Sequence, residues 1–253
     1  MRRQALHPFR ELPVPKNVTQ FPLDGAVMTI NPFPGPQVCW PASLDFDVAA
    51  AVEETRRIAR EHDKDTVAWW IAPEHDPLVP SLEALGIANK DTPGFEATEN
   101  AMALVHEPRG GRPEGVEVRL VETFGDYVAV ARVIEANFGY PPQNEDALHA
   151  RYDEYVNDEN GESVVAVIDG KIVGSAFGAF GGAGINLFGG SVLEEARGRG
   201  IYRAMTFARW DMAVERGTPA LTVQAGKMSM PICEHLGFEL VDRARIFVDE
   251  LAS

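Results

Sequence analysis

Residues 197–202 read Arg-Gly-Arg-Gly-Ile-Tyr, and the segments on either side of them decide the fold. Upstream, residues 185–193 are an apolar run interrupted by glycines, which predicts a β-strand. Downstream, apolar side chains recur at helical spacing up to Gly217, which can cap the helix; they are Ile201, Ala204, Met205, Ala208 and Met212. The sequence therefore predicts a strand, a tight basic turn and a helix N-terminus.

A turn of this kind favours an anionic ligand. The first backbone N–H groups of a helix have no partner within the helix, and the helix dipole attracts negative charge to that end. Glycine lets a phosphate approach the backbone closely, and Arg197, Arg199 and Arg203 add positive charge. We expect the ligand to be a phosphate or a pyrophosphate, unless the glycines merely connect a strand to a helix.

Two common nucleotide-binding loops do not fit this stretch. A dinucleotide-binding loop needs a third glycine where Arg203 stands. A Walker loop needs Gly-Lys-Ser/Thr at its end, and the pair Gly226-Lys227 has Leu221 in the place of the first Walker glycine. A nucleotide is therefore a weak expectation.

The stretch resembles the acyl-CoA signature of the GNAT superfamily of N-acetyltransferases. That signature is Arg/Gln-x-x-Gly-x-Gly/Ala after a strand that ends in valine, and Val192 stands five residues before Arg197. Ser229, Pro231, Ile232 and residues 236–238, Leu-Gly-Phe, are similar to the last motif of the family. The resemblance covers about residues 115–253. It implies an α/β GNAT acyl-CoA N-acyltransferase fold, in which helices flank a mixed central sheet.

The resemblance also implies a cofactor site. Acetyl-CoA, as co-substrate, would lie along the strand end, with its pyrophosphate on the turn and a backbone N–H near Val192 or Leu193 polarising the thioester carbonyl. The expected cofactor-binding residues are Val192, Leu193, Arg197, Gly198, Arg199, Gly200, Ile201, Tyr202 and Arg203. An amine of a small molecule or peptide would then attack directly in a ternary complex.

Catalytic groups are harder to assign. Residues 185–193 contain no acidic side chain, so Glu194 is a weak candidate for the base, although it could be a solvated turn charge. The family often protonates the leaving thiolate with a tyrosine four residues before the glycine of Leu-Gly-Phe, and Cys233 stands at that position. Cys233 is a weak candidate for the acid, and packing is its commoner role. Tyr202 replaces the second glycine of the loop and adds bulk beside the pyrophosphate.

These departures, together with Gly226 in place of a family asparagine, leave a second function open: a non-catalytic CoA-binding sensor or structural protein with the GNAT fold. The sequence does not assign the acceptor-binding residues. Tyr140, Tyr152 and Tyr155 are weak candidates, and ordinary packing explains them equally well.

The composition of the 253 residues narrows the possible partners. The net charge of -15 argues against nucleic acid, whose phosphates require a basic surface. No apolar run is long enough for a membrane helix, no secretory signal stands at the N-terminus, and two cysteines make no disulfide framework. We expect a cytoplasmic protein that binds no metal, and the sequence leaves its oligomeric state unknown.

The second half of the chain has a clear element order. The polar segment 107–115 is interpreted as a linker before an acetyltransferase domain at residues 116–253. Asp169-Gly170 between two apolar runs predicts a hairpin with a type I′ turn. The predicted order is strand, two helices, hairpin, strand, helix, strand, helix, strand, with Asn144 as the N-cap of the second helix.

Residues 1–106 resemble part of the same pattern. Residues 59–61, 67–71 and 82–87 follow one another as do residues 213–215, 221–225 and 232–238, with Leu-Gly in the last segment of each. We interpret residues 1–106 as a partial, degenerate GNAT-like repeat, while two unrelated αβ segments are the alternative. Asp45 and Asp47 stand where its phosphate turn would be, and these carboxylates would repel a phosphate.

Overall fold

The computed structural model describes residues 1–32 and 35–251. The chain forms two compact units, and each contains a strand-helix-strand arrangement of its own. Unit 1 comprises Met1–Pro15 and Ala101–Val241, and unit 2 comprises Lys16–Asn100 and Asp242–Ser253. These bounds differ from the division at residues 107–115 expected from the sequence, because that segment packs within unit 1.

Unit 1 has the element order that the sequence predicts. Its elements are α1 (Arg2–Leu6), α2 (Pro8–Glu11), β7 (Glu117–Leu120), α5 (Phe124–Phe138), α6 (Glu145–Tyr155), β8 (Gly161–Ile168), β9 (Lys171–Gly181), β10 (Gly184–Val192), the 3₁₀ helix η2 (Glu194–Ala196), α7 (Ile201–Glu215), β11 (Leu221–Ala225) and α8 (Met230–Leu236). Two strands cross the boundary between the units: β6 (Thr98–Leu104) and β12 (Glu239–Glu250).

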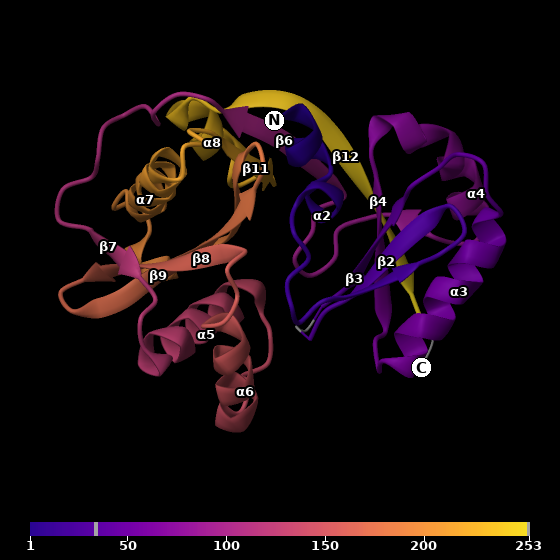
Figure 1. The fold of residues 1–253 in the computed structure, drawn as a ribbon, viewed down its shortest axis with the longest axis horizontal. Coiled ribbons are helices and arrows are strands. Elements are labelled where there is room, and N and C mark those ends of the chain that lie inside the picture. The colour runs from indigo at the N-terminus through magenta and orange to yellow at the C-terminus, as the bar shows by residue number, and fades with distance from the viewer. Residues whose placement is uncertain (33–34, 252–253) are drawn as a thin grey trace. The chain divides into compact units, whose positions relative to one another are not determined.

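The sheet of unit 1 has the order β6-β11-β10-β9-β8-β7. Strands β7 to β10 pair antiparallel, whereas β10 and β11 are parallel. The β8–β9 turn has positive φ at both central residues, 50° at Asp169 and 75° at Gly170, as a type I′ turn requires. In Figure 1, α5 and α6 lie on one side of β8 and β9, and α7 lies on the other.

The face of this sheet turned toward α7 is apolar. Ile185, Leu187, Leu221 and Val223 pack in one cluster with Trp210 of α7. Because side chains alternate along a strand, the residues between them face the other way. Asn186, Thr222 and Gln224 form a hydrogen-bonded network on that second face; Gln4 of α1 also bonds to Thr222, and the main-chain carbonyl of Ala5 accepts from Gln224.

Unit 2 repeats part of this architecture. Its elements are β1 (Thr19–Pro22), β2 (Ala26–Ile30), β3 (Gln37–Pro41), α3 (Val48–Glu61), β4 (Thr66–Ile71), the 3₁₀ helix η1 (Pro73–Leu78), α4 (Val79–Ala84) and β5 (Ala88–Asn89). Strands β3 and β4 are parallel and joined through α3, as β10 and β11 are joined through α7. Gly86 after α4 has a φ of 81°, and Gly237 after α8 has 96°.

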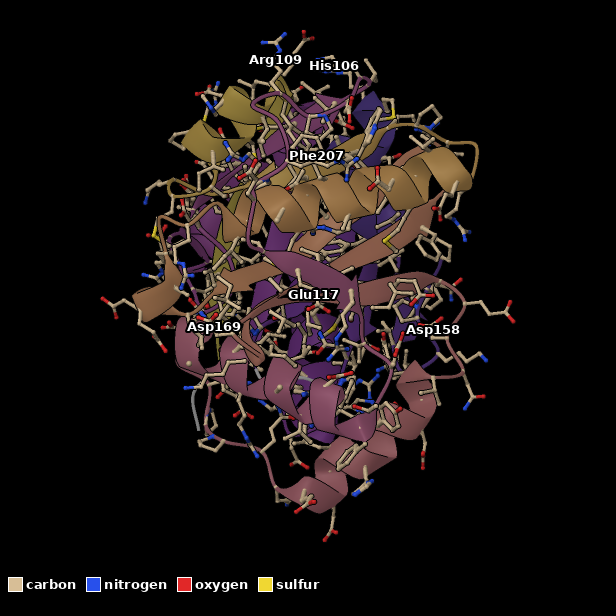
Figure 2. All side chains as sticks on the ribbon, turned by 90° about the vertical axis from the view of Figure 1, so that its left-hand side faces the viewer. His106, Arg109, Glu117, Asp158, Asp169 and Phe207 are labelled. Atoms are coloured by element: carbon tan, nitrogen blue, oxygen red, sulfur yellow. The ribbon has the colours of Figure 1, made fainter. Side chains whose placement is uncertain are left out.

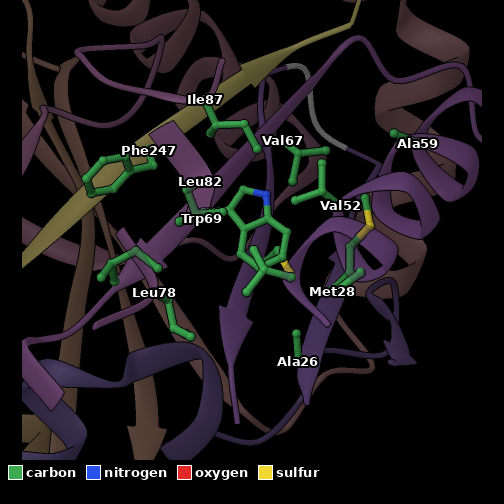
Figure 3. Packing of buried hydrophobic residues seen from close by; sticks show 14 of the residues in the cluster. Ala26, Met28, Val52, Ala59, Val67, Trp69, Leu78, Leu82, Ile87 and Phe247 are labelled. Carbon is green, nitrogen blue, oxygen red and sulfur yellow. The ribbon is translucent and has the colours of Figure 1, made fainter. Parts of the chain in front are cut away.

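The core of unit 2 surrounds Trp69, which is fully buried (Figure 3). Val52 of α3, Val67 of β4 and Leu82 of α4 belong to the same cluster. Burying a large aromatic side chain removes 150–250 Å² from water, so Trp69 makes one of the largest contributions to this core. The predicted repeat of helix, strand, helix and Leu-Gly turn is thus present as a folded unit.

Candidate functional site

The N-terminus of α7 is the open helix end that the sequence predicts. Gly198 and Gly200 are left-handed, with φ of 78° and 77°. Gly200 is the N-cap and offers no side chain to the helix, and the first intrahelical bond runs from the Ala204 N–H to the Gly200 carbonyl. The N–H groups of Ile201, Tyr202 and Arg203 are therefore left to a ligand or solvent. An anion fits this position.

The equivalent helix of unit 2 has a different N-terminus. Asp47 is the N-cap of α3, and its carboxylate accepts a 3.0 Å hydrogen bond from the Ala50 N–H. A fixed negative charge already occupies that helix end, so a phosphate would be repelled there. Of these two equivalent helices, only α7 has an N-terminus without a side-chain cap.

The arginines of the loop have different roles. Arg197 is exposed and donates from Nε to the Val192 carbonyl at 3.3 Å and from Nη2 to Asn137 at 2.9 Å, which ties the loop to β10 and α5. Arg199 is exposed beside the turn. Within the described residues, the buried Nε of Arg203 has no hydrogen-bond partner. A buried donor without a partner is costly, so Arg203 suits a ligand at this helix end.

Strands β10 and β11 separate just before this loop. Their pairing runs only from Ile185 with Leu221 to Leu187 with Val223. On the other edge of β10, the register with β9 shifts between Phe188 and Ser191, so Gly189 and Gly190 form a bulge. The end of β10 therefore has one edge paired to β9 and one edge without a paired strand. The acyl-CoA arm is expected to lie along this second edge.

The direction of the backbone distinguishes Val192 from Leu193 as the residue whose N–H would polarise the thioester carbonyl. The Leu193 N–H donates to the Val173 carbonyl at 2.9 Å, so it is already used. Backbone groups alternate in direction along an antiparallel pair, so the N–H of Val192 points away from β9, toward the open edge. Of the two, Val192 has the amide that fits the polarising role.

The Tyr202 side chain packs against β10 and α8. A Cβ placed on Gly190 would lie 2.6 Å from Cε2 of Tyr202, so the ring rests on the bulge. Its hydroxyl lies 3.9 Å from Sγ of Cys233 on α8. The ring packs against the apolar cluster that contains Cys233, and the bulk expected beside a bound pyrophosphate stays a prediction.

The candidate acid and base have contrasting environments. Cys233 is fully buried, and burial raises the pKa of its thiol to about 11, which suits a packed thiol better than a proton donor. Glu194 is exposed in η2, and its neighbour Glu195 is exposed as well. The described part of β10 carries no carboxylate, so the structure adds no stronger candidate for the base.

The candidate acceptor tyrosines pack against other rings. Tyr152 and Tyr155 of α6 both contact Tyr127 of α5, and the Tyr152 hydroxyl donates to the Glu122 carbonyl. Tyr140 stacks on Phe138, at 5.9 Å between centroids. The contacts of Tyr152 and Tyr155 with Tyr127 join α6 to α5, and a role of the three candidate tyrosines in binding an acceptor stays a prediction.

The segment 107–115 packs against α7 and α8. The Arg109 N–H donates to the Leu236 carbonyl, and Arg112 makes two hydrogen bonds to Asp211 of α7. A Cβ on Gly200 would lie 3.1 Å from the Pro113 ring. Figure 2 shows His106 and Arg109 at one end of the face that carries Phe207 of α7. Sequence reasoning missed this contact because it interpreted the segment as a linker.

Arg209 was also missed. It stands on the buried face of α7 with no exposed surface, and it donates to the carbonyls of Met205 and Phe177. Within the described residues its Nη2 has no partner. The sequence does contain a signal for this buried arginine, because Arg209 stands at helical spacing from the apolar residues Met205 and Met212. Across residues 1–32 and 35–251, no group of His, Cys, Asp and Glu is placed to hold a metal ion.

Known proteins with similar structures share this architecture over most of the chain. A GCN5-related N-acetyltransferase from Kribbella flavida has a TM-score of 0.68 and 19% identity, covering 98% of this chain and 95% of its own. A second, from Sphaerobacter thermophilus, has a TM-score of 0.63 and 18% identity, covering 91% and 82%. A tandem GNAT protein from the clavulanic acid biosynthesis pathway has a TM-score of 0.61 and 15% identity, covering 95% and 85%.

No protein-family model and no curated protein matches the chain. Among the described residues, no helix is both long and apolar enough to cross a bilayer. At sequence identities of 15–19%, the similarity to these solved structures shows the fold alone. The chain has the fold of the GCN5-related N-acetyltransferases, with a mixed sheet flanked by helices and a tandem protein among its structural neighbours.

Proposed function

We propose that this protein is an N-acetyltransferase that moves an acetyl group from acetyl-CoA to a primary amine of a small molecule or peptide. The observation that carries the proposal is the uncapped N-terminus of α7 beside the open edge of β10. Free amides at residues 201–203 suit a pyrophosphate, and the Val192 amide suits a thioester carbonyl. Charge-assisted hydrogen bonds of this kind contribute about 1.5–3 kcal/mol each.

Direct attack requires a neutral amine. An amine with a pKa near 10.4 is neutral in only about one molecule in 2,500 at pH 7, so a base or a water chain must remove its proton. Glu194 remains the weak candidate, and an exposed carboxylate at the site rim could act through water. Both cysteines are free thiols, which supports a reducing compartment, the cytoplasm, as the place of action.

The second candidate function is a CoA-binding sensor or structural protein without turnover. Its support is the buried Cys233 in the place of a tyrosine and the lack of a carboxylate on the described residues of β10. Both functions use the same anion site, and they differ in whether the thioester is broken.

Calorimetry with CoA and a thiol-release assay with acetyl-CoA and a panel of primary amines test the proposal. We expect about one CoA per chain, because the carboxylate of Asp47 caps the equivalent helix of unit 2. We also expect thiol release that depends on the amine. CoA binding without release under any amine would favour the sensor, and the absence of CoA binding would refute both functions.

A further inference from the structure

Basic side chains gather next to the N-terminus of α7. The Arg203 guanidinium reaches two places: a Cβ built on Gly200, the N-cap, would lie 3.5 Å from its Nη2, and a Cβ built on Gly110 would lie 3.4 Å from its Nη1. The same Cβ on Gly110 would lie 3.7 Å from Nε2 of His235, which belongs to α8. The His235 imidazole therefore lies close to a guanidinium that reaches the open helix end.

Two more basic side chains meet at the C-terminus of α8. A Cβ built on Gly237 would lie 3.1 Å from Nε of Arg109 and 2.7 Å from Cε1 of His106, so a glycine at this position leaves room for both. The Arg109 N–H donates to the Leu236 carbonyl, which holds this part of the chain against α8. Figure 2 shows His106 and Arg109 at the same end of the face that carries Phe207. We call four side chains the basic cluster: Arg203, His235, Arg109 and His106.

The protein itself does not neutralise the basic cluster. Within residues 1–32 and 35–251, none of its four side chains forms an ion pair with a carboxylate, although the net charge of the chain is -15. Arg112 of the same segment differs, because it pairs with Asp211 at 2.6 Å. The carbonyls at the C-terminus of α8 attract cations, but a helix end carries only about half a charge. The remaining positive charge suits an anion with more than one charge.

We propose, resting on the CoA binding of the function proposed above, that the basic cluster binds the 3′-phosphate of CoA. Two of the three phosphate groups of CoA form the pyrophosphate, and the third is a monoester on the ribose 3′-oxygen. A phosphomonoester carries about 1.5 to 2 negative charges at pH 7 and three acceptor oxygens, to which guanidinium and imidazole N–H groups donate. With the pyrophosphate on the amides of residues 201–203, Arg203 reaches both anions, and the basic cluster distinguishes CoA from dephospho-CoA, which has a 3′-hydroxyl.

Calorimetry with CoA and dephospho-CoA measures this preference without an acceptor amine. We expect the native protein to bind CoA about 10- to 100-fold more tightly, as one charge-assisted hydrogen bond alone allows. Arg109→Gln keeps the main-chain bond to the Leu236 carbonyl and removes one charge beside the phosphate. It should reduce the preference about 5- to 15-fold, and His235→Gln should reduce it in the same direction. The affinity of both variants for dephospho-CoA should stay native.

Arg216→Gln is the matched control, because it removes the same charge from the C-cap of α7, at the opposite end of that helix. Its preference for CoA should equal that of the native protein. A native preference in both Arg109→Gln and His235→Gln, even with a lowered melting temperature, would overturn the proposal, because the residues would then only stabilise α8. Equal binding of CoA and dephospho-CoA by the native protein would overturn it too, and would leave the proposed function intact. Failure of the native protein to bind either compound would instead refute the proposed function.

Discussion

A charge placed at Gly198 tests the anion site with little disturbance of the fold. The residue is exposed, and a Cβ built on it contacts nothing within 4 Å, so a side chain fits. Its φ of 78° is left-handed, a region that Asn and Asp tolerate better than other residues with a Cβ. The pair Gly198→Asp and Gly198→Asn therefore differs mainly in one negative charge.

The size of the effect follows from Coulomb's law. Residue 198 stands three positions before the first residue of α7, and we take about 6 Å from a carboxylate there to a pyrophosphate of two charges. With an effective dielectric constant of about 40–80 at this exposed turn, the repulsion is about 1.4–2.8 kcal/mol. The Kd for CoA should therefore be about 10- to 100-fold weaker in Gly198→Asp than in Gly198→Asn.

Isothermal titration calorimetry with CoA measures this difference directly. It should shrink as salt rises from about 0.01 M to 1 M, because the Debye length falls from about 30 Å to 3 Å. The melting temperatures of the two variants should agree, which excludes a folding defect as the cause. Equal Kd values for the Asp and Asn variants at low salt would refute the placement of the pyrophosphate at this helix end.

Three further predictions concern the same unit. Gly200→Ala should lower the free energy of unfolding more than Gly198→Ala does. Both glycines have a left-handed backbone, but only Gly200 packs against Pro113. Equal losses for the two variants in urea titration would contradict this prediction. Cys233→Ala should lower the melting temperature and change kcat by less than about 10-fold, because the thiol is fully buried in the core. A fall in kcat of about 100-fold or more, with the melting temperature unchanged, would instead show that Cys233 is the general acid. Arg119 holds the pKa of Asp126 well below its usual range, so Asp126→Asn should lower the free energy of unfolding by about 2 kcal/mol above about pH 5. This difference from the native protein should become smaller as the pH falls, because protonation of the native carboxylate removes its contribution to stability. A difference that stays constant down to about pH 2 in acid unfolding curves would argue against the ion pair.

Local signals in the sequence predicted the elements of unit 1 because their causes are local. A type I′ turn needs two residues that tolerate positive φ, and Asp169-Gly170 provides them. Asn144 caps α6 through a 2.8 Å bond to the Ala147 N–H, three residues away. The open N-terminus of α7 is also local, because it depends only on glycine at the cap.

The interior of the site could not be predicted in the same way. Tyr202 and Cys233 are 31 positions apart, and nothing in their flanking residues tells which way either side chain turns. The Pro and Gly content around Arg112 predicts a linker, yet the hydrogen bonds from Arg112 to Asp211 span 99 positions. Contacts of this range depend on the packing of α7 and α8, which periodicity alone does not specify.

The two repeats explain why likeness of fold is not enough to assign a site. In both, a strand is followed by a helix and a parallel strand, and the turn after the next helix is a left-handed glycine. The difference lies in one N-cap residue: Asp47 fills the N-terminus of α3 with a carboxylate, and Gly200 leaves that of α7 open. A helix dipole attracts a phosphate only where no fixed anion already satisfies the amides. We infer that the chemistry proposed for this chain follows from which helix end is uncapped, and an architecture common to both repeats does not determine that difference.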